Sequence, residues 1–556
     1  MTDPIDPDFS PRDPQMTNTT NEVDNAPRNA ATTRRQILTL VGEVGGVAAM
    51  YRAMTALGFA AESSYSGPIN LQDAPKGSSV LILGAGIAGL VAAYELRRAG
   101  YEVTVLEYNR RAGGRAWTIR GGDEYTELGG FGQTCEFDEG LYFNPGPWRI
   151  PFHHHAILDY AKRFGVALEP FIQVNYNAYV HGRNAFGGKP QRYRHVQADY
   201  QGHVAELLAK AANGHQLDAE LSREDQDKLL ESLRSWGALD RQFRYATNTN
   251  SSDRRGYAVD PGGGLMPDPV PSEPLDRNEL LRSQLWRSIA AGAEYEFQST
   301  IFQPVGGMDQ IAMAVYRQVK DLVRFNARVT KIDQSDTGVT VTYADTGDVS
   351  ASPRLATADW CICTIPLSIL SQIEVTAGQP MRDAIHAVPY AAAFKAGLQF
   401  KRKFWEQDEH IYGGISYSDL PINRISYPST GYGQPGKGVV VGSYVFGPNA
   451  FEFSAMTPQE RLREVLRQGA QIHPQYPDEF ENGISVGWHR VPWTNGCYGL
   501  WSDAARNAHY KNLCQIDGRL ALAGEHASYL PAWQEGAVLS ALDVAQRLHA
   551  RIKSGN

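Results

Sequence analysis

Cysteine is scarce in this sequence, and the few residues present lack the spacing of a metal site or a disulfide framework. Five cysteines, an odd number, occur in 556 residues, and no two form a Cys-x-x-Cys pair. Zinc sites and small disulfide-stapled domains depend on such paired spacings. We therefore expect no metal site, and we interpret Cys361 and Cys363, on a predicted strand, as core residues.

Long apolar runs and an excess of positive charge are missing as well. No apolar stretch reaches the roughly 20 residues that a membrane-spanning helix needs. The formal net charge is −8, which argues against nucleic acid or an anionic membrane surface as a partner. The 42% hydrophobic and 21% charged residues are typical of a globular protein, and the length predicts more than one domain.

The N-terminal region has two parts. Residues 1–33 are rich in Asp, Asn, Thr and Pro with almost no aliphatic side chains, so we expect them to be disordered. Residues 34–62 open with two arginines and continue as a mildly apolar segment. This segment fits either a twin-arginine export signal or a helix that docks onto the body, because Glu43 interrupts the apolar region and no clean cleavage site follows. Cytoplasmic and exported locations therefore both stay open.

The best-defined motif runs from Val80 to Glu107. A short apolar strand, Val80–Leu83, is followed by a glycine-rich turn and by a helical pattern that ends at Ala99. A second strand, Glu102–Leu106, then ends directly before Glu107. The order of strand, turn, helix, strand and acid predicts a dinucleotide site rather than an ordinary glycine-rich turn.

Each glycine of the turn has a physical role in such a site. Gly84 allows the tight turn, Gly86 lets the backbone approach a pyrophosphate, and Gly89 lets the helix lie close to the strand. The helix N-terminus supplies N–H donors and a partial positive charge to the phosphates. Glu107 is placed to accept hydrogen bonds from an adenosine ribose.

The segment Arg111-Ala112-Gly113-Gly114-Arg115 follows the acid directly, and here the sequence resembles the flavin-dependent amine oxidase family. The fingerprint of that family is a GxGxxG unit followed by an acid and an RxGGR segment. The resemblance implies that the cofactor is FAD and that Gly114 and Arg115 lie near its pyrophosphate. An arginine beside two glycines suits phosphate, because its fork donates two bonds and the glycines let backbone come close.

Further family motifs follow in the expected order, and the resemblance covers about residues 76–550. A Pro-x-Gly-Gly-Met turn at 304–308 is expected to open a helix beneath the flavin, and the backbone of Val329 is expected to meet the adenine. Near the C-terminus, Glu525 is expected to hold the ribitol, and a second helix N-terminus is aimed at the cofactor. The residues that the resemblance assigns to the cofactor in this region are Gly524, Glu525, Trp533, Gln534 and Ala537.

The fold class that these segments predict is α/β. We expect a Rossmann-like, dinucleotide-binding FAD domain that is discontinuous in sequence, with an inserted α+β substrate-binding domain and a helical subdomain. The expected boundaries are 76–135, 300–385 and 510–550 for the FAD domain, 140–190 and 388–500 for the substrate-binding domain, and 195–295 for the helical subdomain.

Local patterns add detail to this organisation. Alternation predicts a hairpin of Arg328–Ile332 with Gly338–Tyr343, and a mixed sheet from Ala391–Trp405, Gly438–Tyr444 and Gly483–Trp488 that forms one wall of a substrate cavity.

The helical and histidine-rich segments have plainer interpretations. Ser222 and Asp225 are typical of a capping box that begins a helix. Thr247–Pro274 is rich in Gly, Pro and Asp, and we expect one long loop there. The consecutive histidines 153–155 would fan round a helix, so we expect them to be solvated and not to share a metal.

The segment Gly146-Pro147-Trp148-Arg149 is similar to the GPxR segment of the L-amino acid oxidases within this family. The resemblance is strongest to the bacterial FAD-dependent L-amino acid oxidases. The resemblance implies that Arg149 binds the substrate carboxylate, that Tyr444 donates a second bond to it, and that Trp148 and Arg149 border the cofactor. A guanidinium suits this task because it binds both oxygens in one plane and stays charged when buried. The alternatives are a structural ion pair for Arg149 and a core position for Tyr444.

Two further residues complete the expected catalytic set. Lys395 matches the lysine that holds a water against flavin N5, and it lies in an apolar alternating strand. A buried ammonium needs a partner and shifts its pKa downward, and a cation near N5 favours electron transfer to dioxygen. Trp533 is expected to form an aromatic wall beside the reacting carbon, with a packing role as the alternative.

The resemblance implies oxidative deamination of L-amino acids by hydride transfer to FAD, giving a 2-oxo acid, ammonium and hydrogen peroxide. The alternatives are an amino-acid 2-monooxygenase, a monoamine oxidase, or a redox-idle flavoprotein that serves as a binding module. Cys497 resembles the cysteine that monoamine oxidases join to the flavin, although we favour non-covalent FAD. By family analogy alone we expect a homodimer.

Overall fold

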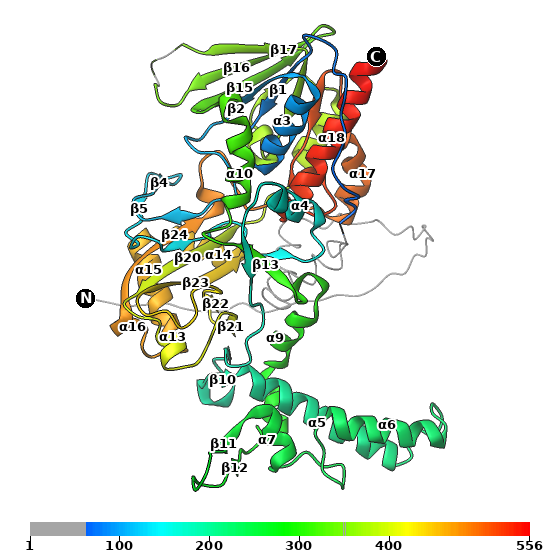
Figure 1. The fold of residues 1–556 in the computed structure, drawn as a ribbon, viewed down its shortest axis with the longest axis vertical. Helices are drawn as coiled ribbons and strands as arrows, with labels where there is room; N and C mark the ends of the chain where they lie inside the picture. Colours follow the sequence, from blue (N-terminus) through cyan, green and yellow to red (C-terminus); the bar gives the residue numbers. More distant parts are fainter. Residues whose placement is uncertain (1–62, 349, 351, 556) are drawn as a thin grey trace, which may run out of the picture.

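The computed structural model describes residues 63–348, 350 and 352–555 (Figure 1). The predicted disorder of residues 1–33 and the predicted export signal or docking helix at 34–62 lie outside the described residues. The described residues form three parts (Figure 1). An upper body holds two sheets and their helices, a second body lies below it, and a helical arm projects at the bottom of the view.

The centre of the upper body is a parallel sheet of five strands. Its order is β14-β2-β1-β18-β25, and every neighbouring pair in it is parallel. The first and last of these strands in sequence, β1 and β25, are separated by most of the described chain, so the sheet is assembled from segments that are far apart in sequence. The bounds are β1 Ser79–Leu83, β2 Glu102–Leu106, β14 Val323–Arg324, β18 Trp360–Cys363 and β25 Leu520–Leu522.

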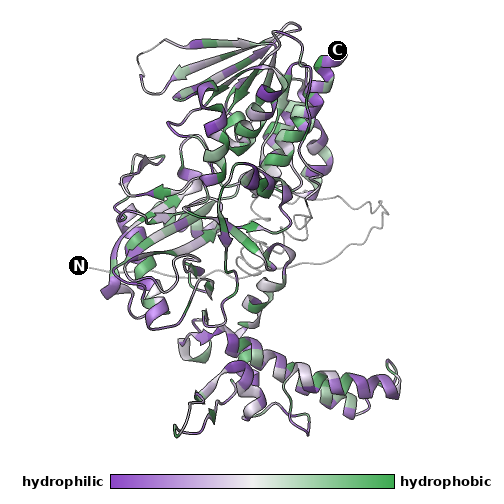
Figure 2. Cartoon of the chain, viewed as in Figure 1, coloured by the Kyte–Doolittle hydropathy of each residue, from purple (hydrophilic) through white to green (hydrophobic). Residues whose placement is uncertain are grey.

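Three helices cover one face of this sheet: α3 (Ile87–Ala99), α10 (Gln310–Val319) and α18 (Gln534–Ser554). The close approach of α3 depends on Gly89, since a Cβ atom there would lie 2.0 Å from the carbonyl oxygen of Gly84. Apolar residues run along the strands and helices of this body, and polar residues mark its outer turns (Figure 2). The dinucleotide unit therefore forms as the sequence predicts.

A four-stranded sheet lies against the other face, in the order β17-β16-β15-β19. The predicted hairpin is confirmed, because β15 and β16 pair antiparallel. Cys361 and Cys363 are fully buried core residues, as predicted. Both pack toward this side, because side chains two positions apart in a strand share a face. The bounds are β15 Ala327–Gln334, β16 Val339–Asp345, β17 Arg354–Ala358, β19 Glu374–Val375, α11 Leu367–Leu370, α12 Gln379–Ala387 and α17 Asp503–Cys514.

The second body is built on a mixed sheet of seven strands, in the order β10-β9-β21-β22-β23-β20-β24. The strand β20 is buried at all eight positions, because helices cover one of its faces and an apolar cluster that includes Phe143 and Trp488 covers the other. The bounds are β9 Tyr179–His181, β10 Gln191–Arg192, β20 Ala393–Phe400, β21 Ile415–Ser418, β22 Arg424–Ser426, β23 Gly438–Phe446, β24 Phe480–Gly487, α13 Phe404–Gln407, α14 Gly447–Ala455, α15 Pro458–Gly469 and α16 Tyr476–Glu479.

The arm is mainly helical, and α5 and α6 extend away from both bodies (Figure 1). The predicted cap is present, because the Ser222 side chain accepts a hydrogen bond from the backbone N–H of Asp225. The expectation of one long loop at Thr247–Pro274 is wrong: Asn248 caps a short helix there, and a two-stranded hairpin follows it. The bounds are α5 Tyr193–Asn213, α6 Arg223–Trp236, α7 Thr249–Arg255, β11 Tyr257–Val259, β12 Val270–Pro271, α8 Arg277–Ser283 and α9 Trp286–Ala290.

Small elements join the bodies. A three-stranded sheet, β7-β13-β8, fixes the loop that precedes it at residues 144–149. No helix among the described residues is long and apolar enough to cross a membrane. The remaining bounds are β3 Ile119–Arg120, β4 Glu124–Thr126, β5 Gly132–Thr134, β6 Tyr142–Phe143, β7 Ile150–Pro151, α4 His155–Arg163, β8 Leu168–Pro170 and β13 Ile301–Pro304.

Candidate active site

Two cavities meet at the glycine-rich turn before α3, and we term them together the nucleotide channel. Gly86, Arg115 and Thr364 line both cavities, so the two join at the helix N-terminus. A Cβ atom built on Gly86 would meet no protein atom within 4 Å, which leaves this backbone open to a ligand. The channel thus has the extended shape and the bare helix N-terminus that a dinucleotide requires.

The outer end of the channel contains Glu107 and Val329. Glu107 is buried at the end of β2, and its Oε2 accepts a hydrogen bond from the backbone N–H of Ala85 at 2.6 Å. Its Oε1 accepts two bonds from Asn109 at 2.8 Å. These contacts hold the carboxylate at the strand end, where a ribose would need it.

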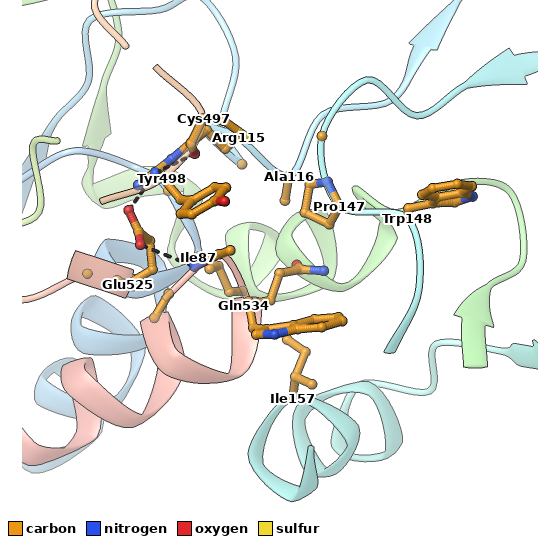
Figure 3. A pocket seen from close by; sticks show the side chains of 18 of the residues that line it. Ile87, Arg115, Ala116, Pro147, Trp148, Ile157, Cys497, Tyr498, Glu525 and Gln534 are labelled. Atoms are coloured by element: carbon orange, nitrogen blue, oxygen red, sulfur yellow. Dashed lines mark hydrogen bonds and ion pairs between the residues drawn. The ribbon is translucent and has the colours of Figure 1, made fainter. Parts of the chain in front are cut away.

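The middle of the channel holds a paired cation. The Arg115 guanidinium donates to Glu525 Oε1 at 2.7 Å and to the carbonyl of Cys497 at 2.9 Å. Figure 3 shows these three residues gathered at one end of the inner cavity, with Trp148 at the other. Gly114 packs against the turn, since a Cβ atom there would lie 3.1 Å from the Cα of Gly86. The RxGGR segment and Gly524-Glu525 are therefore brought together.

A second helix N-terminus opens into the same cavity. Trp533, Gln534 and Ala537 line it from the start of α18, and no side chain caps this helix. Gln534 is buried, and its Oε1 has no hydrogen-bond partner among the described residues. The free N–H groups and the unsatisfied amide oxygen provide polar groups for a bound ligand.

Glu535, next along α18, points away from the cavity and joins two helices. Its carboxylate accepts hydrogen bonds from the backbone N–H groups of Ala156 at 2.9 Å and Ile157 at 2.8 Å, in the first turn of α4, and from the Ser63 hydroxyl. Because α4 follows directly on the loop with Arg149, this contact fixes the cofactor-facing helix relative to the substrate loop.

Lys395, on β20, lies behind the cavity wall that Gly146, Trp148 and Tyr444 form, with only 1% of its surface exposed. Its Nζ donates to the carbonyl oxygens of Gly146 at 2.7 Å and Asn144 at 3.2 Å, and it lies 4.2 Å from the Tyr444 ring centroid. Burial lowers the pKa of Lys395 to about 7. The site therefore contains an ammonium that changes charge near neutral pH.

Arg149 stands where the inner cavity meets a larger cavity beyond it. Its side chain is buried, with Cζ 4.2 Å from the Phe297 ring centroid and 5.1 Å from that of Trp148. Its Nε and Nη1 have no hydrogen-bond partner, and no carboxylate of the described residues lies within 4.0 Å of it. Burial raises the pKa of nearby Glu296, which weakens that residue as a counter-ion. An external anion would satisfy the Arg149 guanidinium.

Tyr444 from β23 completes this group. Its ring centroid lies 5.0 Å from that of Trp148, so the two rings share one corner of the cavity, and Lys395 lies directly behind them. Trp533 lines the cavity from α18. Three of the four predicted catalytic residues, Arg149, Tyr444 and Trp533, thus line a single cavity. Lys395 lies behind its wall, in contact with the Trp148 and Tyr444 rings.

The histidines at 153–155 differ from expectation. His153 and His154 are buried because α4 begins only at His155, so both lie in the preceding turn and pack inward. His154 lines the cavity edge-on to Trp533, at 4.9 Å between ring centroids. Burial lowers its pKa well below the usual range, so the ring is neutral. No group of three metal-ligating side chains forms among the described residues.

Sequence reasoning also missed residues beyond Arg149. Phe297 and Gln173 line the larger cavity beyond Arg149, and so does Arg424, the first residue of β22. A single arginine in a short strand carries no signal in the sequence, because its direction depends on the register of β22 with β21 and β23.

Comparisons with known proteins agree with this geometry. A family model described as flavin containing amine oxidoreductase matches residues 87–549. YobN of Bacillus subtilis (strain 168), provisionally named as an L-amino-acid oxidase, is 30% identical over 84% of this chain and 94% of its own length. The L-amino-acid oxidase of Vipera ammodytes ammodytes is 28% identical over 84% of this chain and 92% of its own length.

Solved structures with the same fold include two amine oxidases. Cyclohexylamine oxidase from Brevibacterium oxydans IH-35A has a TM-score of 0.57 at 15% identity, covering 86% of this chain and 100% of its own. Wild-type putrescine oxidase bound to putrescine has a TM-score of 0.56 at 17% identity, covering 85% and 99%. At these identities the likeness concerns the fold, and it confirms the predicted α/β class.

Proposed function

The chain belongs to the family of flavin-containing amine oxidoreductases, and we propose that within it the protein oxidatively deaminates L-amino acids with dioxygen. The observation that carries this proposal is the Arg149 guanidinium, buried against aromatic rings at the cavity and without a carboxylate partner among the described residues. A substrate carboxylate would supply the missing charge. The relatives named as L-amino-acid oxidases support the same substrate class.

We propose FAD as the cofactor because the nucleotide channel fits it at both ends. Glu107 would accept the ribose hydroxyls, the open backbone at Gly86 and the Arg115 guanidinium would meet the pyrophosphate, and Glu525 would hold the ribitol. The free N-terminus of α18 would stabilise negative charge on the ring. When bound, this flavin supplies a two-electron acceptor that dioxygen can reoxidise.

The residues of the chain position the substrate. Arg149 and Tyr444 bind the carboxylate and so fix the direction of the Cα–H bond. Trp148 and Trp533 confine the substrate between aromatic walls and exclude water. Lys395, held by the carbonyl oxygens of Gly146 and Asn144, keeps a cation directly behind the wall that Trp148 and Tyr444 form. The released imino acid then hydrolyses to a 2-oxo acid and ammonium.

Product analysis tests the proposal against its nearest rival, an amino-acid 2-monooxygenase. With L-amino acids and air, we expect one hydrogen peroxide and one ammonium per 2-oxo acid formed. Carbon dioxide with an amide product would identify a monooxygenase instead. An anaerobic screen in which simple amines bleach the flavin and no amino acid does would favour a monoamine oxidase, and no bleaching at all would favour a redox-idle flavoprotein.

Cys497 offers a possible covalent link, since it lines the inner cavity. Burial raises the pKa of its thiol to about 11, so the reactive thiolate is scarce at neutral pH. We therefore expect FAD to be held without a covalent bond. Acid precipitation should leave all the yellow colour in the supernatant, and a yellow pellet that turns colourless in Cys497→Ser would contradict this expectation.

A further inference from the structure

A second cavity, which we term the vestibule, continues beyond Arg149 with a volume of about 530 Å³. The end of β9, the start of β22, the loop after β21 and the base of the arm form its walls. Because Arg149 lines both the inner cavity and the vestibule, a substrate whose carboxylate binds this residue has the vestibule within reach. The vestibule walls can therefore contact the substrate side chain.

Arg424 is the buried charged residue of the vestibule wall nearest the catalytic group. It begins β22 with 5% of its surface exposed, and its Cζ lies 5.2 Å from the Tyr444 ring centroid. Its Nε donates to Asn423 Oδ1 at 3.2 Å, which orients the guanidinium plane. A buried, oriented guanidinium beside the substrate site is suited to a planar anion.

The charge of the vestibule has the same sign as Arg424. Four arginines line it, against the two carboxylates of Glu294 and Asp419. Asp419 faces Arg183 outside the vestibule at 3.6 Å, which reduces its effect inside. Burial lowers the pKa of His181 in the wall, so this ring adds no charge near neutral pH. Arg282 and Arg287 are exposed at the mouth, where they attract anions from solution.

Arg149 and Arg424 also act on a common neighbour. Both guanidinium groups contribute to lowering the pKa of Lys395, which places both within electrostatic range of the cavity corner at Tyr444. The vestibule thus has two buried cations: Arg149, where it meets the inner cavity, and Arg424, in its wall. A ligand with two anionic ends would match both.

We propose that the preferred substrates are L-amino acids with a carboxylate side chain, with Arg149 binding the α-carboxylate and Arg424 binding the side-chain carboxylate. This inference rests on the proposed function and narrows it to dicarboxylic amino acids. Asn423 and Asn449 line the same wall and can donate to the second carboxylate.

The test uses pairs of amino acids that differ in charge and hardly in shape. L-glutamate is compared with L-glutamine, and L-aspartate with L-asparagine, by kcat/KM of the holoenzyme at pH 7.5 and 0.15 M salt. A charge-assisted hydrogen-bonded pair favours the acid by about tenfold to a hundredfold. If glutamine or leucine is oxidised as well as glutamate, this inference fails while the proposed function stands. If no amino acid reduces the flavin, the proposed function itself fails.

Variants assign the preference to Arg424. In Arg424→Gln we expect the glutamate-to-glutamine ratio of kcat/KM to fall to within about twofold of one, with the larger loss on glutamate. Arg424→Lys should keep only part of the preference for glutamate, because the positive charge remains but the planar guanidinium that binds both carboxylate oxygens is lost. Arg467→Gln, an exposed arginine of α15, is the control and should keep the wild-type ratio. An equal loss for both substrates in Arg424→Gln would place Arg424 on the α-carboxylate and overturn the proposal.

A binding measurement guards against a variant that merely folds badly. Glutarate, which has two carboxylates and no amine, is titrated into the holoenzyme by calorimetry, and butyrate serves as the single-carboxylate probe. We expect wild type to bind glutarate at least about tenfold more tightly than butyrate, and Arg424→Gln to bind the two alike. If the wild-type protein binds glutarate and butyrate equally tightly, the proposal of a second anion site is wrong.

Discussion

Arg149→Met is expected to lower kcat/KM for L-amino acids by about a hundredfold to a thousandfold, because two charge-assisted hydrogen bonds to the substrate carboxylate are lost. Methionine is chosen because it keeps most of the side-chain volume between Phe297 and Trp148. The loss should appear with every amino acid tested, since all carry the same α-carboxylate. Steady-state peroxide formation measures it.

The folding stability of Arg149→Met should change in the opposite direction to its activity. The Arg149 guanidinium is buried with two nitrogen atoms unsatisfied among the described residues, and such a charge costs folding free energy. We therefore expect the melting temperature of Arg149→Met to equal or exceed that of wild type, which separates lost recognition from lost folding. Arg149→Lys should recover only part of the activity, because an ammonium cannot bind both oxygens in one plane. Substantial activity on L-amino acids in Arg149→Met would refute the carboxylate role.

Lys395→Met is expected to lower the second-order rate constant for dioxygen by about a hundredfold while anaerobic reduction by the amino acid changes little. A unit charge stabilises an opposite charge about 6 Å away by about 3 kcal/mol at an effective dielectric constant of ~20, which corresponds to roughly a hundredfold in rate. Negative charge develops when dioxygen accepts an electron, so the Lys395 cation should act on the reoxidation half of the catalytic cycle. Stopped-flow reoxidation of the reduced enzyme measures the constant.

The pH dependence identifies Lys395 as the cation. Burial lowers its pKa to about 7, so the side chain is charged below that pH and neutral above it. The dioxygen constant of wild type should therefore fall as pH rises from 6 to 8, and Lys395→Met should give a flat profile at the low level. Lys401→Met, an exposed lysine beyond the same strand, should match wild type. A wild-type constant that rises with pH would argue against a cationic role.

Motifs with strict backbone requirements were predictable from the sequence. The turn at Gly84, Gly86 and Gly89 could be placed because each glycine has a steric reason that holds in any such unit, and the structure shows that reason at Gly89. Hairpin β15–β16 followed from the period-two pattern that one covered face imposes, and β18 followed from a short apolar run typical of a strand buried on both faces. Local chemistry decided these elements, so sequence alone was enough.

The features that the sequence did not predict depend on contacts between distant segments of the chain. The predicted loop at Thr247–Pro274 contains a helix whose cap, Asn248, lies among residues that otherwise favour turns. His154 was expected in water, but the turn before α4 buries it against Trp533. Arg424 became visible only once β22 had a register. In each case, packing against another part of the chain outweighed the local pattern.

The central parallel sheet has a consequence for biosynthesis. Its first strand in sequence, β1, leaves the ribosome well before its edge strand β25 and the covering helix α18, because more than 430 residues separate β1 from both. At about 5–20 residues per second, the interval is roughly 20–90 s. During that time the apolar faces of β1 and α3 lack their partners, so the nascent chain exposes them to chaperones and to aggregation. Loss of the C-terminal helix should therefore leave an insoluble product rather than a weak enzyme.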